Sequence, residues 1–214
     1  MALAFGNTNG KAVKNTYESY TYKDGENTVR IFGGILPRYV YWVKGINDKD
    51  IPIECLAFNR NTEKFDNKEV DHVPNYFPEK KCSWSYSVNC IAGDKVVVLN
   101  LKKKLFEQLT GAAQDLGLDP TDADTGFDVV FKRTKTGALA YNVEYTLSQL
   151  KLKSRALSAS ERELVAAAVP IDDKFPRQSA EEIKTFLDRI TKGESEPTSE
   201  ATSDMDHEAI NELG

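Results

Sequence analysis

The chain has 214 residues, of which 40% are hydrophobic and 10% aromatic, and 28 basic against 33 acidic side chains give a formal net charge of −5. No stretch approaches the ~20 apolar residues that span a bilayer, and residues 1–10 lack the basic and apolar regions of a secretory signal. Three cysteines, an odd number, argue against a secreted disulfide framework, so we expect a reducing, cytoplasmic compartment.

The first half of the chain has the pattern of short strands. A polar, irregular arm over residues 1–27 precedes runs of β-branched and aromatic residues, which Gly33-Gly34 and Pro37 interrupt. The predicted strands span residues 28–32, 39–44, 51–58, 83–92 and 95–101. The polar stretch 59–81 is expected to be a loop or small insertion.

The second half mixes helices with one hairpin. Apolar residues recur at helical spacing over residues 102–116, and Gly117 occupies the position of a C-cap glycine. Residues 127–134 and 139–147 predict a hairpin. Two capping-box signatures, Ser160 with Glu163 and Ser179 with Glu182, predict two further helices.

This order predicts a mainly β fold with α-helices, in the form of an OB-fold-like five-stranded barrel. The helix between the early strands and the final hairpin fits that barrel, whose helix usually follows the third strand. The expected divisions are an arm (1–27), a nucleic-acid-binding core (28–150, with 59–81 as a loop or insertion), C-terminal helices (151–192) and a disordered acidic tail (193–214).

Charged residues are distributed unevenly between the body of the chain (1–192) and its tail (193–214). Residues 193–214 carry seven acids and no lysine or arginine, which leaves 28 basic against 26 acidic side chains in the body. An acidic terminal block is typical of an interaction tail. The predicted partner-binding residues of the tail are Asp204, Met205, Asp206, Glu208, Ile210, Glu212 and Leu213. The alternative is that the tail supplies only solubility and that its apolar residues are incidental.

The sequence carries no signature of catalysis. A Walker phosphate loop, a G-x-G-x-x-G turn and a G-x-S-x-G elbow are all absent, and of the two histidines, His207 lies in the acidic tail. We therefore expect a protein that is not an enzyme, with a nuclease built from scattered carboxylates as the weaker alternative.

A zinc site is an alternative in which the protein would hold a metal ion. Cys55, His72, Cys82 and Cys90 could supply a Cys₃His set, but the chain has no C-x-x-C element. Small buried thiols are the more common role of free cysteine, so we expect neither a metal nor another cofactor.

Cations and aromatic rings are interleaved along the body, as in proteins that hold a single strand in a basic groove and stack its bases on rings. The predicted contacts are Arg30, Tyr41, Trp42, Lys44, Arg60, Lys132, Arg133 and Lys135. The competing interpretation is that such rings form the core, which the alternation of Trp84 and Tyr86 with Val88 and Cys90 favours. The lysines at 102–104 oppose the dipole of the helix that they open; a phosphate contact would explain them, and a solvated helix face is the equally favoured alternative.

The order of these blocks resembles the single-stranded DNA-binding, helix-destabilising proteins of tailed phages, of the T-even type. The matching blocks are VRIF at 29–32, the aromatic strand at 39–43, KVVVLNLKKKLFEQL at 95–109, GFDVVFKRTKTGALAYNVEYTL at 126–147, two short helices and the acidic tail. The chain departs from that type in lacking C-x-x-C and in having only Lys11 and Lys14 as basic residues among its first twenty.

The resemblance implies an OB-fold core that binds single-stranded DNA without sequence preference during phage replication, recombination and repair, in the host cytoplasm. It also implies that the tail contacts replication, recombination and repair proteins and restrains binding to duplex DNA. The T-even type has a basic N-terminal arm for cooperative self-association, which this chain lacks, so we expect only weak self-association on DNA. A protein-interaction or assembly module is the rival hypothesis.

Overall fold

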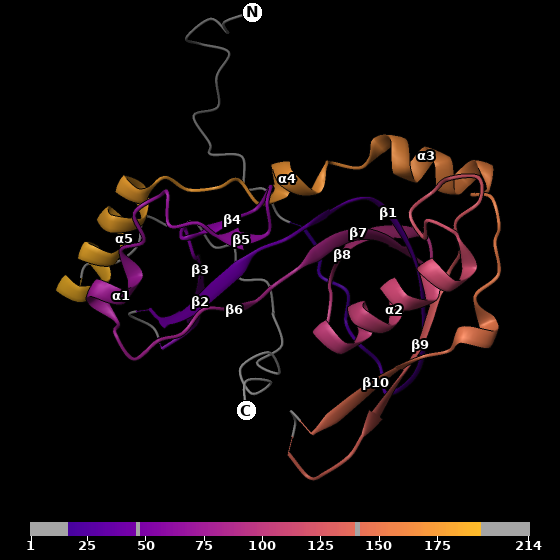
Figure 1. The fold of residues 1–214 in the computed structure, drawn as a ribbon, viewed down its shortest axis with the longest axis horizontal. Coiled ribbons are helices and arrows are strands. Elements are labelled where there is room, and N and C mark those ends of the chain that lie inside the picture. The colour runs from indigo at the N-terminus through magenta and orange to yellow at the C-terminus, as the bar shows by residue number, and fades with distance from the viewer. Residues whose placement is uncertain (1–16, 46–47, 140–141, 194–214) are drawn as a thin grey trace, which may run out of the picture.

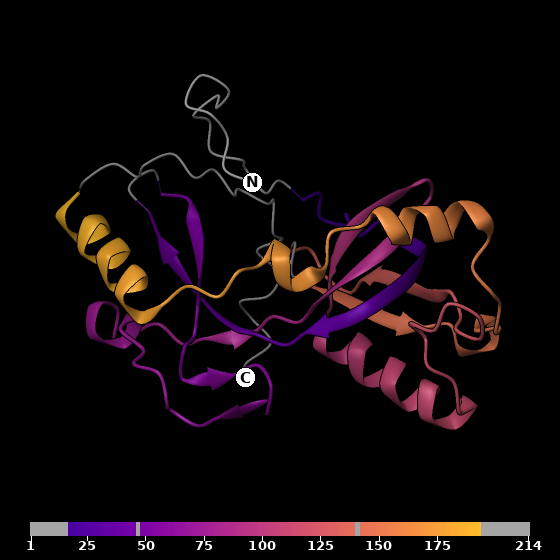
Figure 2. The ribbon, with the colours of Figure 1, turned by 90° about the horizontal axis from the view of Figure 1, so that it is seen from above.

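A computed structural model describes residues 17–45, 48–139 and 142–193. Its elements form two lobes, which Figures 1 and 2 show side by side. The elements, in chain order, are β1 (Gly25–Leu36), β2 (Tyr39–Lys44), β3 (Asp50–Glu54), β4 (Phe58–Asn59), β5 (Lys64–Phe65), α1 (Val73–Tyr76), β6 (Ser83–Trp84), β7 (Ser87–Ala92), β8 (Lys95–Asn100), α2 (Lys103–Leu116), β9 (Val129–Lys135), β10 (Val143–Leu147), the 3-10 turn η2 (Gln149–Lys151), α3 (Ala159–Ala167), α4 (Ile171–Lys174) and α5 (Ala180–Lys192).

The larger lobe is built on a five-stranded antiparallel sheet in the order β10-β9-β1-β7-β8. Its core contains the apolar faces of all five strands together with Leu105, Leu109 and Ala112 of α2. The predicted helix and hairpin are confirmed, and Gly117 ends α2 in the left-handed conformation at φ 64°. The chain is therefore a mixed α/β protein with an antiparallel sheet and several helices.

The first strand of this sheet is longer than predicted. Gly33-Gly34 was expected to end it, yet β1 continues to Leu36, because the two glycines form an irregularity in the pairing with β7 and Gly33 takes φ 73°. Residues 25–29 of β1 pair with β9 and residues 30–36 pair with β7, so the irregularity lies within the part that pairs with β7.

The sheet does not close into the predicted barrel within the described residues, because its edge strands β8 and β10 do not pair with each other. Helix α2 covers the edge of β10: the Gln108 amide donates to the Tyr145 carbonyl at 3.0 Å and accepts from the Leu147 N–H at 2.7 Å. Ser19 forms a parallel bridge with Val98 along β8. These contacts occupy backbone groups that direct pairing of the edges would use.

The smaller lobe lies between β1 and β7 in the sequence. It contains the sheet β3-β2-β6 and the ribbon β4-β5, and its core joins Tyr41, Val43 and Ile53 to Ile183 and Leu187 of α5. The stretch predicted as a loop over 59–81 contains β5 and α1. Figure 2 shows the segment from α3 through α4 to α5 running from the larger lobe to the smaller one.

One of the two predicted capping boxes is confirmed, and the other lies two residues earlier in the chain than predicted. Ser179 and Glu182 cap α5 as predicted, whereas α3 is capped by Ser158 and Glu161 rather than by Ser160 and Glu163. Both pairs in front of α3 fit the sequence pattern. Glu161 is favoured because its carboxylate also accepts two 2.7 Å bonds from Arg155.

This ion pair gives the fold an acid-sensitive contact. The bonds from Arg155, followed by those from Ser158, lower the pKa of Glu161 to about 2. A lowered pKa in the folded state means that the stabilisation is complete above the ordinary glutamate pKa of about 4.3 and is lost as the pH falls towards 2. We expect Glu161→Gln to lower stability at pH 7 and to flatten the loss of stability between about pH 4.5 and 2, as measured by urea unfolding at each pH; an unchanged pH profile would contradict this.

Candidate nucleic-acid interface

Two of the predicted DNA contacts, Arg30 and Tyr41, are buried, and a third, Arg60, is half-buried in an ion pair. Arg30 is 2% exposed and donates to the carbonyls of Asp122 at 2.6 Å and Arg155 at 3.3 Å. The Tyr41 hydroxyl, which is also buried, donates to Asp71 at 2.9 Å. The guanidinium of Arg60 binds Glu54 through two nitrogens. These side chains hold the fold together rather than face a ligand.

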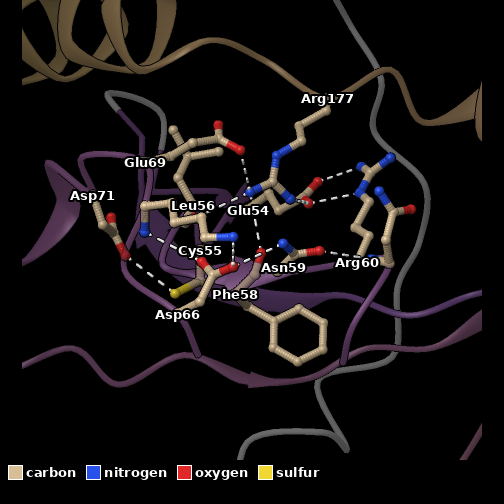
Figure 3. Close-up of polar contacts among 12 residues, drawn as sticks. Glu54, Cys55, Leu56, Phe58, Asn59, Arg60, Asp66, Glu69, Asp71 and Arg177 are labelled. Atoms are coloured by element: carbon tan, nitrogen blue, oxygen red, sulfur yellow. Dashed lines mark hydrogen bonds and ion pairs between the residues drawn. The ribbon is translucent and has the colours of Figure 1, made fainter. Parts of the chain in front are cut away.

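The arginines of the smaller lobe converge on one buried carboxylate, as Figure 3 shows. Glu54, at the end of β3, accepts from Arg60 at 2.7 Å and from Arg177 at 2.7 Å. Arg177 also donates to the carbonyls of Leu56 and Phe58 at 3.0 and 3.1 Å. The carboxylate thus ties β3 and β4 to the segment that leads into α5.

The other predicted contacts are divided between two sheets. On β2, Trp42 is half-buried, and Lys44 is exposed at the strand end but pairs with Asp50 at 3.0 Å. On β9, Arg133 pairs with Asp24, and Lys135 lies 3.9 Å from the same carboxylate.

Lys132 of β9 is exposed and has no ion-pair partner in the part of the chain that the structure describes. The predicted set therefore forms no single surface, since its members lie on β2, on β9 and in the interior. The predicted tail residues lie outside the described residues.

The candidate zinc ligands are also separated. Cys90 is buried in the core of the larger lobe, whereas Cys55 and Cys82 belong to the core of the smaller lobe. Cys55 contacts the Asp71 carboxylate at 3.1 Å. Among the described residues, no group of three or more His, Cys, Asp or Glu side chains is arranged to hold a metal ion.

A different set of aromatic residues forms a connected group of rings, partly buried and partly exposed, which we call the aromatic band: Tyr39, Phe58, Phe65, Trp84, Tyr86 and Phe106. In the smaller lobe the Tyr39 ring lies 4.8 Å from Phe58 and 4.9 Å from Phe65, measured between centroids. Phe65, on β5, is 49% exposed. This end of the aromatic band therefore presents an apolar ring to solvent.

The other end of the aromatic band packs against the core of the larger lobe. Trp84 stacks on Tyr86 with ring centroids 4.3 Å apart and an interplanar angle of 14°, and Phe106 of α2 lies 5.7 Å from both rings. Tyr39 joins the two ends, because it is the partner of Trp84 in the pairing of β2 with β6 and cross-strand partners share a face. Trp84 and Phe106 are half-buried, so part of each ring remains accessible.

Lysines adjoin both ends of the aromatic band. Lys64 is exposed beside Phe65 on β5, and Lys103 and Lys104 are exposed in the first turn of α2, one turn before Phe106. The N-terminus of α2 has no side-chain cap and no acid in its first turn. Its free N–H groups and dipole favour an anion, and the lysines reinforce that preference.

The sequence contained a signal for part of this surface. Lys102 and Lys103 precede Phe106 by four and three residues, a spacing that places a cation and a ring on adjacent turns of one helix face. Tyr86 is buried as the alternating pattern predicts, but Trp84 is only partly so. Tyr39, Phe65 and Phe106 were not among the predicted contacts, because each becomes part of a surface only through pairings between distant segments.

A scan against protein-family models finds no match. A search of curated proteins finds a relative from Escherichia phage T5, described as a probable ssDNA-binding protein, that is 28% identical over 190 residues. The alignment covers 80% of this chain and 71% of the relative. In the described part of the chain, no helix is both long and apolar enough to cross a membrane.

Proposed function

We propose that the protein binds single-stranded DNA without sequence preference and is not an enzyme. The observation that carries the proposal is the aromatic band with lysines at both ends, one of them at the uncapped start of α2. The similarity to the phage T5 protein, which is described as a probable ssDNA-binding protein, supports the same function.

The arrangement suits a single strand rather than a duplex. Every base has a flat apolar face, so stacking on Trp84 or Phe65 requires unpaired bases and does not depend on their identity. Lys64, Lys103 and Lys104 would neutralise phosphates between stacked bases. Lys132 and Lys135 on β9 offer a second basic surface along which a longer strand could continue.

An OB-fold remains our proposal for the larger lobe. Three sheet strands, β1, β7 and β8, precede α2, and β9 and β10 follow it, which is the placement expected of the helix in that fold. The OB-fold is a partly open Greek-key barrel, so edges covered by α2 and by the segment near Ser19 are compatible with it.

The proposal predicts a salt dependence that Lys103 and Lys104 carry in part. Replacing both by Gln should weaken binding to a dT oligonucleotide and reduce the slope of log Kobs against log salt by about 1.4, since each phosphate contact on a single strand contributes about 0.7. The control is Lys184→Gln with Lys192→Gln on the exposed face of α5. Equal slopes for the two double variants would contradict the assignment of these lysines.

We further propose that the protein protects and organises single strands during phage replication, recombination and repair, and that its tail recruits protein partners and competes with DNA. The seven acids of residues 193–214 adjoin a body with a small basic excess. Deleting this segment should tighten DNA binding, most strongly at low salt because exposed charges are screened as salt rises. Equal affinity with and without the tail at both low and high salt would refute the competition.

A further inference from the structure

The turn between β4 and β5 contains a residue in an unfavourable conformation. Glu63, directly before β5, has φ 51°, in the left-handed region that costs a residue with a side chain roughly 1 kcal/mol and that glycine normally occupies in such hairpins. Asp48 and Asn67, other described residues with positive φ, are of the types that tolerate this region. A glutamate has no such local advantage, and a retained outlier is a reason to look for a function.

The side chain of Glu63 makes a specific contact with the aromatic band. The Tyr86 hydroxyl donates to its carboxylate at 2.8 Å, so a turn of the smaller lobe holds a ring that belongs to the core of the larger lobe. Burial and then this hydrogen bond raise the pKa of Tyr86, and the phenol remains a donor at neutral pH. Tyr86 in turn lies flat against Trp84 at 4.3 Å.

Within the described structure, the hydrogen bond from Tyr86 is the side-chain interaction that accounts for the Glu63 carboxylate. Glu63 has no ion pair with a described cation, and a carboxylate beside a strand of phosphates is unfavourable for binding. Its position is thus explained by what it does to Tyr86 rather than by a contact with DNA.

We propose that Glu63 is a positioning residue for single-stranded DNA: it fixes Tyr86 as the support on which Trp84 presents its outer face to a base. This inference rests on the proposed function, because it assigns the role of a residue that does not itself touch the strand. It also links the β4–β5 turn of the smaller lobe to Tyr86, which belongs to the core of the larger lobe.

The test compares Glu63→Gly with Glu63→Gln in the full chain carrying Trp42→Phe, which leaves Trp84 as the single tryptophan. Gly relieves the backbone strain and removes the acceptor, so the thermal midpoint should stay constant or rise while the Kd for a dT oligonucleotide increases about three- to tenfold. Gln keeps an acceptor oxygen and should bind at least as tightly as the parent. Gly should also weaken the near-UV circular dichroism of the Trp84–Tyr86 stack, and Gln should retain it.

Tyr86→Phe gives an independent arm, because it keeps the ring and removes the donor. It should reproduce the effect of Glu63→Gly, and the double variant should bind no more weakly than either single variant. Parent-like affinity and dichroism for Glu63→Gly would overturn the inference, as would additive losses in the double variant. If Trp84→Leu leaves affinity unchanged, the proposed stacking surface fails instead, while the dichroism still reports whether Glu63 orders the stack.

Discussion

Replacing Trp84 by leucine is expected to raise the Kd for a dT oligonucleotide about 5- to 150-fold. Stacking of one base on an aromatic ring contributes about 1–3 kcal/mol, and leucine removes the flat π-face while keeping apolar bulk against Phe106 and Tyr86. The measurement is fluorescence anisotropy of a labelled oligonucleotide at fixed salt.

Trp42→Phe is the matched control for this variant, because it changes the other tryptophan, which lies outside the aromatic band. It should leave the Kd within about twofold of the parent value. A loss for Trp42→Phe as large as that for Trp84→Leu would move the stacking surface to β2, where the sequence pattern first placed it. A melting curve for each variant separates lost binding from lost folding.

Replacing Glu54 by glutamine is expected to cost about 3–5 kcal/mol of the free energy of unfolding. The carboxylate is 9% exposed and pairs with both Arg60 and Arg177, so its loss leaves the largely buried Arg60 without its counter-charge and leaves Arg177 with Glu69 alone, at 3.1 Å. For a chain of this length, each kcal/mol lowers the melting temperature by about 2–4 °C. The melting temperature of the Glu54 variant should therefore lie well below that of the parent protein.

The control for the Glu54 variant is a solvent-exposed ion pair of the same lobe. Lys184 and Asp188 pair at 2.9 Å on α5 with both side chains more than a third exposed. Lys184→Ala should change stability much less than the Glu54 variant does, because exposed ion pairs contribute little. If the Glu54 variant melts within 2 °C of the parent, the buried network does not hold the segment before α5 on the smaller lobe.

Local features of the fold could be predicted from the sequence because they depend on neighbouring residues. The periodicity of α2, the left-handed Gly117 and the Ser179 cap each need information from within about one helical turn. The turn α1 could not be predicted in this way. It has four residues, and its Tyr76 is held by Asp188 across 112 positions of the sequence.

The candidate site was harder to predict for a related reason. A cation beside a ring in the sequence does not reveal which of them faces solvent. Arg30 and Arg60 are engaged by the carbonyls of Asp122 and Phe175, 92 and 115 residues away. Conversely, Tyr39 and Trp84 become neighbours only when β2 pairs with β6.

The proposed stacking of bases on the aromatic band is tested most directly by a fluorescence titration with poly(dT). In the Trp42→Phe protein, Trp84 is the sole tryptophan and reports contact at the band itself. Micromolar protein should show quenching that saturates with poly(dT) and reverses as salt is added, because both stacking and phosphate neutralisation hold the strand. Unchanged Trp84 emission at low salt would contradict the account and favour a protein-interaction module.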